Sequence, residues 1–302
     1  MHTQTDGAVM VGVAESIFTG WALHWAAEQA QMEGRTLALV NASGPVLGAR
    51  REYGSSQTPS SSASLREHGE ELLARARAVV AKVAPQVPVD EVFEIADPGM
   101  LLNQLSSSAH LLVLGSRGRG PVRSHLLGSV GLAAVRHAVC PVVVHRPGDH
   151  PGHVHSGVLV AAEATADSRP VLEFAFHIAS LRGLPLKVVH YVYDVRSALV
   201  GAPMPGTLGG EAGHRARTLS ECLAGYREGY PDVHLVVETR TGLVPEQDLR
   251  RIGRDAALTV VGSHQRRVVD RLLTGSVSES VLEHGCGAVA VVPTVDPRKR
   301  SA

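Results

Sequence analysis

The sequence is short of two residue types that carry chemistry, cysteine and lysine. Its 302 residues include three cysteines, Cys140, Cys222 and Cys286, and none of them stands in a C-x-x-C pair. This number and spacing supply neither a disulfide framework nor a zinc site, and they favour a reducing compartment. Only three of the 29 basic residues are lysine, which excludes mechanisms that need a phosphate-loop lysine or a Schiff base.

Excess charge and long apolar runs are also missing. Lys and Arg together number 29, Asp and Glu number 29, and the formal net charge is zero, so the basic footprint of a nucleic-acid-binding protein is absent. No stretch approaches the roughly 18 apolar residues that span a bilayer, and the N-terminal residues show no export signal. We therefore expect a cytoplasmic protein whose partners include neither nucleic acid nor membrane.

What the sequence does contain is an internal repeat at about half its length. Two segments within residues 9–43, VMVGVAES and LALVNAS, are similar to VLVAAEAT and LKVVHYV within residues 158–192, at an offset of 149. The segment LLVLGSRGRG, which begins at Leu111, is similar to LTVVGSHQRR, which begins at Leu258, at an offset of 147. Such well-kept spacing indicates a duplicated domain. We expect a first domain over 1–147, a linker over 148–156, a second domain over 157–295 and a tail over 296–302.

Within each half, short β-branched runs alternate with 3.6-residue patterns, which is typical of a parallel α/β sheet. Ten strands are expected, at residues 8–13, 36–41, 89–95, 110–115 and 141–145, and again at 157–162, 185–192, 233–238, 257–262 and 288–292. Helices are expected at 18–33, 64–84, 98–107, 129–138, 168–181, 211–229, 244–254 and 276–284. Each half also carries a long polar or Gly/Pro-rich insertion after its second strand, of a length typical of functional lids or disordered segments.

A glycine-rich loop follows the fourth strand of the first half. Gly115-Ser-Arg-Gly118 is separated by nine residues from Gly128-Ser129, the pattern G-x2-G-x9-G-[ST]. Glycines at the carboxyl end of a strand let backbone N–H groups approach phosphate oxygens, and a helix that begins at Ser129 offers unpaired donors and a favourable dipole. The pattern thus favours anion binding. The plainer interpretation, in which the glycines permit turns and Ser129 caps a helix, stays open.

In these motifs and in the repeat, nearly the entire chain resembles the universal stress proteins, in the tandem-domain form of their ATP-binding subgroup. The resemblance implies two tandem five-stranded parallel-sheet α/β/α domains of strand order 3-2-1-4-5, like the adenine-nucleotide alpha-hydrolase fold. It implies that an adenine nucleotide lies across the ends of the first and fourth strands. Physical reasoning agrees, because open α/β sheets bind ligands where the strand order reverses.

The resemblance also assigns roles to single residues. In the first half it implies that glycines and a serine hold the phosphates and ribose and that the region of Val40 meets the adenine. Arg117, Arg119 and Arg123 either add charge near the phosphates or are solvated loop residues, and the sequence leaves this open. The implied nucleotide-binding residues are Val40, Gly115, Arg117, Gly118, Gly128 and Ser129, and, in the second half, Glu163, Gly262, Gly275, Ser276 and Ser278. The implied cofactor is ATP, and the sequence leaves open whether Mg²⁺ accompanies it.

Each half departs from the family pattern at one place. The family usually has an acidic residue at the end of the first strand, where this chain has Ala14; Glu15 follows, but in a continuing strand it points to the opposite face. The second half has Glu163 at the expected place, but Gln265 replaces the second glycine of its loop. A residue with a Cβ does not easily take a positive φ. We therefore expect nucleotide binding to depend chiefly on the first loop.

No catalytic motif accompanies the loop. The sequence contains no G-x-S-x-G, H-E-x-x-H or C-x-x-C, so we name no catalytic residue and expect at most slow ATP hydrolysis. We expect a nucleotide-binding regulatory protein, with a nucleotide-free interaction module and a slow ATPase as the alternatives. We also expect the two halves to pair through their apolar fifth strands, which would otherwise be bare sheet edges, and a homodimer through other surfaces is left open.

Overall fold

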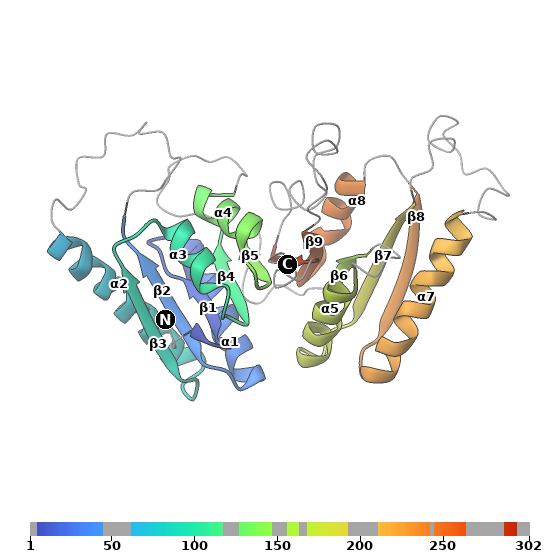
Figure 1. Cartoon of the computed structure of the whole chain (residues 1–302). Coiled ribbons are helices and arrows are strands. Elements are labelled where there is room, and N and C mark those ends of the chain that lie inside the picture. Colours follow the sequence, from blue (N-terminus) through green and yellow to red (C-terminus); the bar gives the residue numbers. More distant parts are fainter. Residues whose placement is uncertain are drawn as a thin grey trace. The chain divides into compact units, whose positions relative to one another are not determined.

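The computed structural model divides the chain into two compact units, Met1–Pro151 and Gly152–Ala302 (Figure 1). The residues that it describes are 5–44, 62–116, 127–146, 156–162, 168–192, 211–241, 245–263 and 287–294. Each unit is a parallel sheet with helices between the strands.

The first unit alternates strands and helices along its whole described length. Its elements are β1 (Val9–Gly12), α1 (Ile17–Glu33), β2 (Leu37–Ala42), α2 (Ser62–Val83), β3 (Val89–Glu94), α3 (Pro98–Leu105), β4 (Leu111–Gly115), α4 (Ser129–His137) and β5 (Val142–His145). All strand pairs are parallel, in the order β3-β2-β1-β4-β5. Strands β1, β2, β4 and β5 are mainly apolar and largely buried, because helices cover both faces of a parallel sheet. Strand β3, at the end of this order, carries Asp90, Glu91 and Glu94 and is only partly buried.

Two glycines show which helices cover which face of the first sheet. A Cβ at Gly12 would meet the side chains of Leu114 and of Leu102 on α3, at 2.6 and 3.8 Å. A Cβ at Gly69 on α2 would lie 2.0 Å from the ring of Phe93 and 3.0 Å from Oδ1 of Asn41. Because α1 packs with α2 and α3 packs with α4, the sheet has an α1/α2 face and an α3/α4 face.

The second unit repeats this plan. Its elements are β6 (Val158–Ala161), α5 (Arg169–Leu181), β7 (Leu186–Val192), α7 (Glu211–Gly229), β8 (Leu235–Thr241), α8 (Pro245–Ile252), the 3₁₀ helix η4 (Gly253–Asp255), β9 (Leu258–Ser263) and β10 (Val289–Pro293). The pairings are again all parallel and give the order β8-β7-β6-β9-β10. Both units therefore have the order 3-2-1-4-5, and the expected fold class is confirmed.

The elements differ from the sequence predictions in a few places. The strand expected at 233–238 is β8, Leu235–Thr241. It extends further because its pairing with β7 continues to Thr241, where Arg240 is held by Glu238 and Asp248. The helix expected at 244–254 ends at Ile252 and continues as η4. The expected helix 276–284 and the greater part of both insertions lie outside the described residues. No helix of the described part is long and apolar enough to cross a bilayer.

Candidate functional site

The glycine loop of the first unit begins and ends at one place in the structure. Gly115 is the last residue of β4, and Gly128 is the N-cap residue of α4, which begins at Ser129. The backbone N–H of Gly128 donates to the carbonyl oxygen of Ser116 at 3.0 Å, and the N–H of Ser116 donates to the carbonyl oxygen of His145 at 2.8 Å. These two bonds hold the start of α4 against the carboxyl ends of β4 and β5.

The N-terminus of α4 has the properties of an anion site. Gly128 has extended backbone angles (φ −62°, ψ 157°) and makes no side-chain cap hydrogen bond. The N–H groups of a first helical turn have no intrahelical partner, and the helix dipole favours negative charge there. The arrangement can therefore bind a phosphate or carboxylate group through backbone donors, without a lysine.

Val40 lies on the α3/α4 face, the same side as α4. It is in register with Gly12 of β1, whose missing side chain would point at Leu102 of α3. Its carbonyl oxygen accepts from the N–H of Val13 at 2.8 Å. Ala42, two residues further along β2, is on the same face and nearer the carboxyl edge. A ligand at the N-terminus of α4 that extends across β1 would reach these positions.

Sequence reasoning did not identify Ser116 as part of this site. Its side chain is only 3% exposed, and its hydroxyl has no hydrogen-bond partner in the part of the chain that the structure describes. The signal was present in the sequence, since Ser116 directly follows Gly115 in the loop motif. A buried hydroxyl without a partner costs free energy, and this one lies at the first residue after β4.

The end of β1 is built without an acidic side chain on the site's face. Ala14 stands there, and Nε2 of His68 on α2 lies 3.9 Å from Oε2 of Glu15, so Glu15 is directed to the α1/α2 face as its position after Ala14 predicts. Asn41 fixes this strand end instead, because its Nδ2 donates to the carbonyl oxygen of Val13 at 2.8 Å.

His190 makes the corresponding bond in the second unit. Asn41 and His190 occupy equivalent places in the repeat, 149 positions apart. Nδ1 of His190 lies 3.1 Å from the carbonyl oxygen of Ala162, and because a carbonyl can only accept, Nδ1 carries the proton. Nε2 is buried and has no hydrogen-bond partner within the described ranges. Both units thus tie their second strand to the residue that follows their first.

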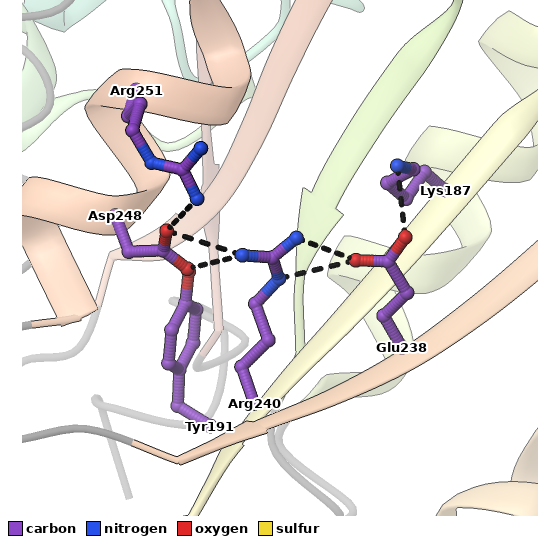
Figure 2. Close-up of polar contacts among 6 residues, drawn as sticks. All are labelled: Lys187, Tyr191, Glu238, Arg240, Asp248 and Arg251. Carbon is purple, nitrogen blue, oxygen red and sulfur yellow. Dashed lines mark hydrogen bonds and ion pairs between the residues drawn. The ribbon is translucent and has the colours of Figure 1, made fainter.

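A network of six polar side chains joins β7, β8 and α8 in the second unit (Figure 2). Asp248 of α8 accepts from the Tyr191 hydroxyl at 2.9 Å, from Arg240 Nη1 at 2.9 and 3.1 Å and from Arg251 Nη2 at 2.8 Å. Glu238 accepts from Arg240 Nη2 at 2.8 Å and pairs with Lys187 Nζ at 2.9 Å. The network bridges the ends of two strands and the helix above them.

The network keeps its two carboxyl groups ionised. Burial alone would raise the pKa of Asp248, but hydrogen bonds from Arg251, Tyr191 and Arg240 outweigh it and lower that pKa. Hydrogen bonds from Lys187 and Arg240 lower the pKa of Glu238. Burial and the bond to Asp248 raise the pKa of the Tyr191 hydroxyl above its ordinary value, so the tyrosine stays neutral and donates.

Several residues of the expected sites cannot be placed. Arg117, Gly118, Glu163, Gln265, Gly275, Ser276 and Ser278 lie outside the described residues. Gly262 lies in β9, in register with Val292 of β10. The structure therefore brings Gly115, Gly128 and Ser129 together in the first unit, with Val40 on the same face of the sheet.

A sequence model of the universal stress protein family matches residues 7–146 and 156–293. The chain belongs to the universal stress protein family. It is 33% identical over 308 residues to a universal stress protein of Mycobacterium tuberculosis, covering 96% of this chain and 97% of the relative. A second M. tuberculosis universal stress protein is 32% identical over 289 residues, covering 91% of this chain and 92% of the relative.

A solved structure has the same fold over both units. The universal stress protein from Archaeoglobus fulgidus is similar to this chain with a TM-score of 0.70 at 18% identity, covering 96% of this chain and 99% of that chain. This likeness concerns the fold. It agrees with the two sheets of order 3-2-1-4-5 in this universal stress protein.

The site of this universal stress protein contains no metal-ligating cluster in its described part, where no three His, Cys, Asp or Glu side chains converge. Of its cysteines, Cys140 is buried and Cys222 is exposed, while Cys286 lies outside the described residues. Burial raises the pKa of the Cys140 thiol to about 12, which makes it a poor nucleophile. Cys140 is therefore a packing residue.

Proposed function

We propose that this chain is a cytoplasmic stress-response protein that binds ATP at the carboxyl edge of its first unit and acts as a regulatory or interaction module. The observation that carries the proposal is the hydrogen bond from Gly128 N–H to the Ser116 carbonyl oxygen. It places the N-terminus of α4, whose first-turn N–H groups have no intrahelical partner, beside the glycine end of β4. Such a helix N-terminus suits the phosphates of a nucleotide.

Several features support adenine nucleotide and the first unit in particular. The complete G-x2-G-x9-G-[ST] pattern occurs in the first half, whereas Gln265 interrupts it in the second. Val40 lies on the same face of the sheet as α4, where it is buried, and Ala42 beyond it is half-buried. Within the family, a universal stress protein from Archaeoglobus fulgidus has been solved with dAMP and another with cAMP.

A nucleotide-free interaction module is the second candidate, and Ala14 is the observation that favours it. Losing one side-chain acceptor weakens binding by about 0.5–1.5 kcal/mol. A phosphate at a helix N-terminus is bound by several backbone N–H groups at once, so we expect the intact loop to contribute more to binding than the missing acceptor removes. We name no residue as a base for hydrolysis, and Mg²⁺ would enter with the phosphates of ATP rather than through a site of protein carboxylates.

We also propose, from the sequence, that the halves pair through their fifth strands. Both strands, Val142–His145 and Val289–Pro293, are rich in valine, and an apolar strand at a sheet edge needs a partner. Residues 1–147 alone should then dimerise or aggregate. A monomeric, soluble fragment at high concentration, measured by light scattering, would show the pairing to be wrong.

Two experiments test the nucleotide proposal. Mass spectrometry of the denatured, purified chain should identify co-purified adenine nucleotide. In titration calorimetry, Gly118→Gln, which copies Gln265 into the first loop, should weaken ATP binding more than tenfold. The matched control is Gly225→Gln on α7, where a Cβ meets nothing within 4 Å, and it should bind ATP like the parent. Equal binding by the parent and Gly118→Gln would contradict a site in the first loop.

A further inference from the structure

The two units differ at the carboxyl edge of the second strand. The repeat sets Tyr191 at the place of Ala42 and Asp248 at the place of Leu101. Register agrees, because Ala42 is opposite Glu94 on β3 and Tyr191 is opposite Arg240 on β8. A small side chain over an apolar helix in one unit is thus replaced by a bulky, hydrogen-bonded side chain in the other.

Tyr191 lies on the face of the second sheet that corresponds to the α3/α4 face of the first. A Cβ at Gly253, which follows α8, would meet Thr259 and Leu159 at 2.8 and 3.6 Å, and Leu159 is in register with Lys187. Alternation along β7 then puts Lys187, Val189 and Tyr191 on this α8 face. Val189 is the repeat equivalent of Val40, so Tyr191 is the next side chain toward the carboxyl edge.

The Tyr191 ring is fixed at both ends. Its Cα belongs to β7, and its hydroxyl donates to Asp248 of α8 at 2.9 Å, so the ring spans the space between strand and helix (Figure 2). Asp248 is itself held by Arg240 and Arg251. Moving the ring aside would leave the Asp248 carboxylate with one donor fewer and the hydroxyl without its acceptor.

We propose that Tyr191, positioned by Asp248 and Arg240, closes the base subsite of the second unit and determines that only the first unit accepts an adenine nucleotide. The inference rests on the proposed function for the location of that subsite. In the first unit the half-buried Ala42 has only a methyl group on this face beyond Val40. In the second unit an aromatic ring and its anchoring carboxylate occupy the equivalent place, although Glu163 provides the acidic residue that the first unit lacks.

The test counts ATP bound per full-length chain by titration calorimetry. All second-unit variants carry Gln265→Gly, so that the interrupted loop does not mask the effect. Gln265→Gly alone should bind one ATP, and Gln265→Gly with Tyr191→Ala should bind two. The matched control adds Tyr230→Ala instead, because Tyr230 stacks on Phe176 away from the network, and it should bind one.

The reciprocal change tests the same subsite in the first unit. Ala42→Tyr should weaken ATP binding at least tenfold. The matched control is Gly225→Tyr on α7, where a Cβ meets nothing within 4 Å, and it should bind ATP like the parent. Circular dichroism and urea unfolding check that each variant folds. If Tyr191→Ala unfolds the second unit, Ala42→Tyr decides the matter alone, and parent-like binding by Ala42→Tyr would then overturn the proposal.

The remaining outcomes separate the two claims. One ATP for both the Gln265→Gly chain and its Tyr191→Ala derivative overturns the closure and leaves the proposed function standing. Two ATP falling to one on Tyr191→Ala would make Tyr191 a base contact and also overturns the closure. A parent that binds no ATP refutes the proposed function, while the closure survives only if the Tyr191→Ala derivative gains one.

Discussion

The two units have the same sheet, but the equivalent helices α3 and α8 are held against it by different kinds of contact. In the first unit, α3 buries Leu101, Leu102 and Leu105. In the second unit, among the α8 residues whose side chains are described, Leu249 is the one that is fully buried and apolar. Its neighbour Asp248 contacts the strands through a hydrogen bond to Tyr191 and an ion pair with Arg240.

The hydrogen bond that ties the second strand to the end of the first strand is the same in both units. Asn41 and His190 differ in chemistry, yet each donates to the carbonyl oxygen that follows the first strand of its unit. A buried backbone carbonyl without a partner is costly in any sequence, so this requirement outlasts changes of side chain. Helix attachment has no such fixed requirement, because either apolar contact or a satisfied polar network can hold a helix.

The largest effect on the free energy of unfolding should come from exchanging the equivalent helix residues Leu101 and Asp248. Leu101→Asp puts a carboxylate where Leu101 is 2% exposed without the donors that Asp248 has, and should destabilise the first unit by about 3–5 kcal/mol. Asp248→Leu should cost the second unit at most about 1 kcal/mol, because the network is partly solvated. Urea unfolding of the full chain, fitted as two transitions, measures both. Equal losses would show that the two attachments are not different in kind.

A middle-sized effect is expected at the strand clamp. Asn41→Ala leaves the Val13 carbonyl oxygen without its buried donor and should cost about 2 kcal/mol. His190→Asn imports the first unit's residue and should cost less than about 1 kcal/mol, since the amide can make the same bond. His190→Ala is the matched control and should resemble Asn41→Ala in urea unfolding. If His190→Asn is as harmful as His190→Ala, the two clamps are not equivalent.

The smallest effect concerns pH. Asp248 and Glu238 have lowered pKa values in the folded chain, so their stabilisation is complete above the ordinary carboxyl pKa of roughly 4 and is lost as the pH falls through the folded values. Because both groups are partly solvated, this should amount to no more than about 1 kcal/mol. Asp248→Asn with Glu238→Gln should therefore reduce the loss of stability of the second unit between pH 7 and pH 3.

Urea midpoints at the two pH values give this difference. Glu71→Gln, which removes the partner of Arg75 in an exposed pair on α2, serves as the control and should leave the pH dependence of the second unit unchanged. An unaltered pH dependence in the network variant would mean that the ion pairs contribute nothing.

The strands and helices of both sheets could be predicted from the sequence because they depend on local patterns of residues. Strands such as Leu111–Gly115 are continuous apolar runs, and helices such as α3 carry their own start signal, with Asp97 capping the N–H of Met100 and Pro98 in the first turn. The repeat then predicted each element twice. Ion pairs between residues distant in the sequence leave no such local pattern. The strand predicted at 233–238 therefore ended before Arg240.

The local geometry of the loop ends was predictable from the sequence, whereas their role in nucleotide binding stays a prediction. Gly115, Gly128 and Ser129 are brought together by one backbone hydrogen bond, which the motif spacing anticipates. Ser116, Asn41 and the Tyr191 network were missed, because their importance depends on burial and on partners far away in sequence. Comparing the two halves position by position is the signal that could have found the last two, since Asn41/His190 and Ala42/Tyr191 occupy equivalent places.

Photolabelling tests the proposed nucleotide site most directly. The full chain would be irradiated with 8-azido-ATP, with and without excess ATP, and the labelled peptides identified by mass spectrometry. We predict label that ATP competes away within residues 9–44, which include Val40 and Ala42, and none in residues 186–192 around Tyr191. Competed label confined to the second unit, or no competed label at all, would contradict a nucleotide site at the carboxyl edge of the first unit.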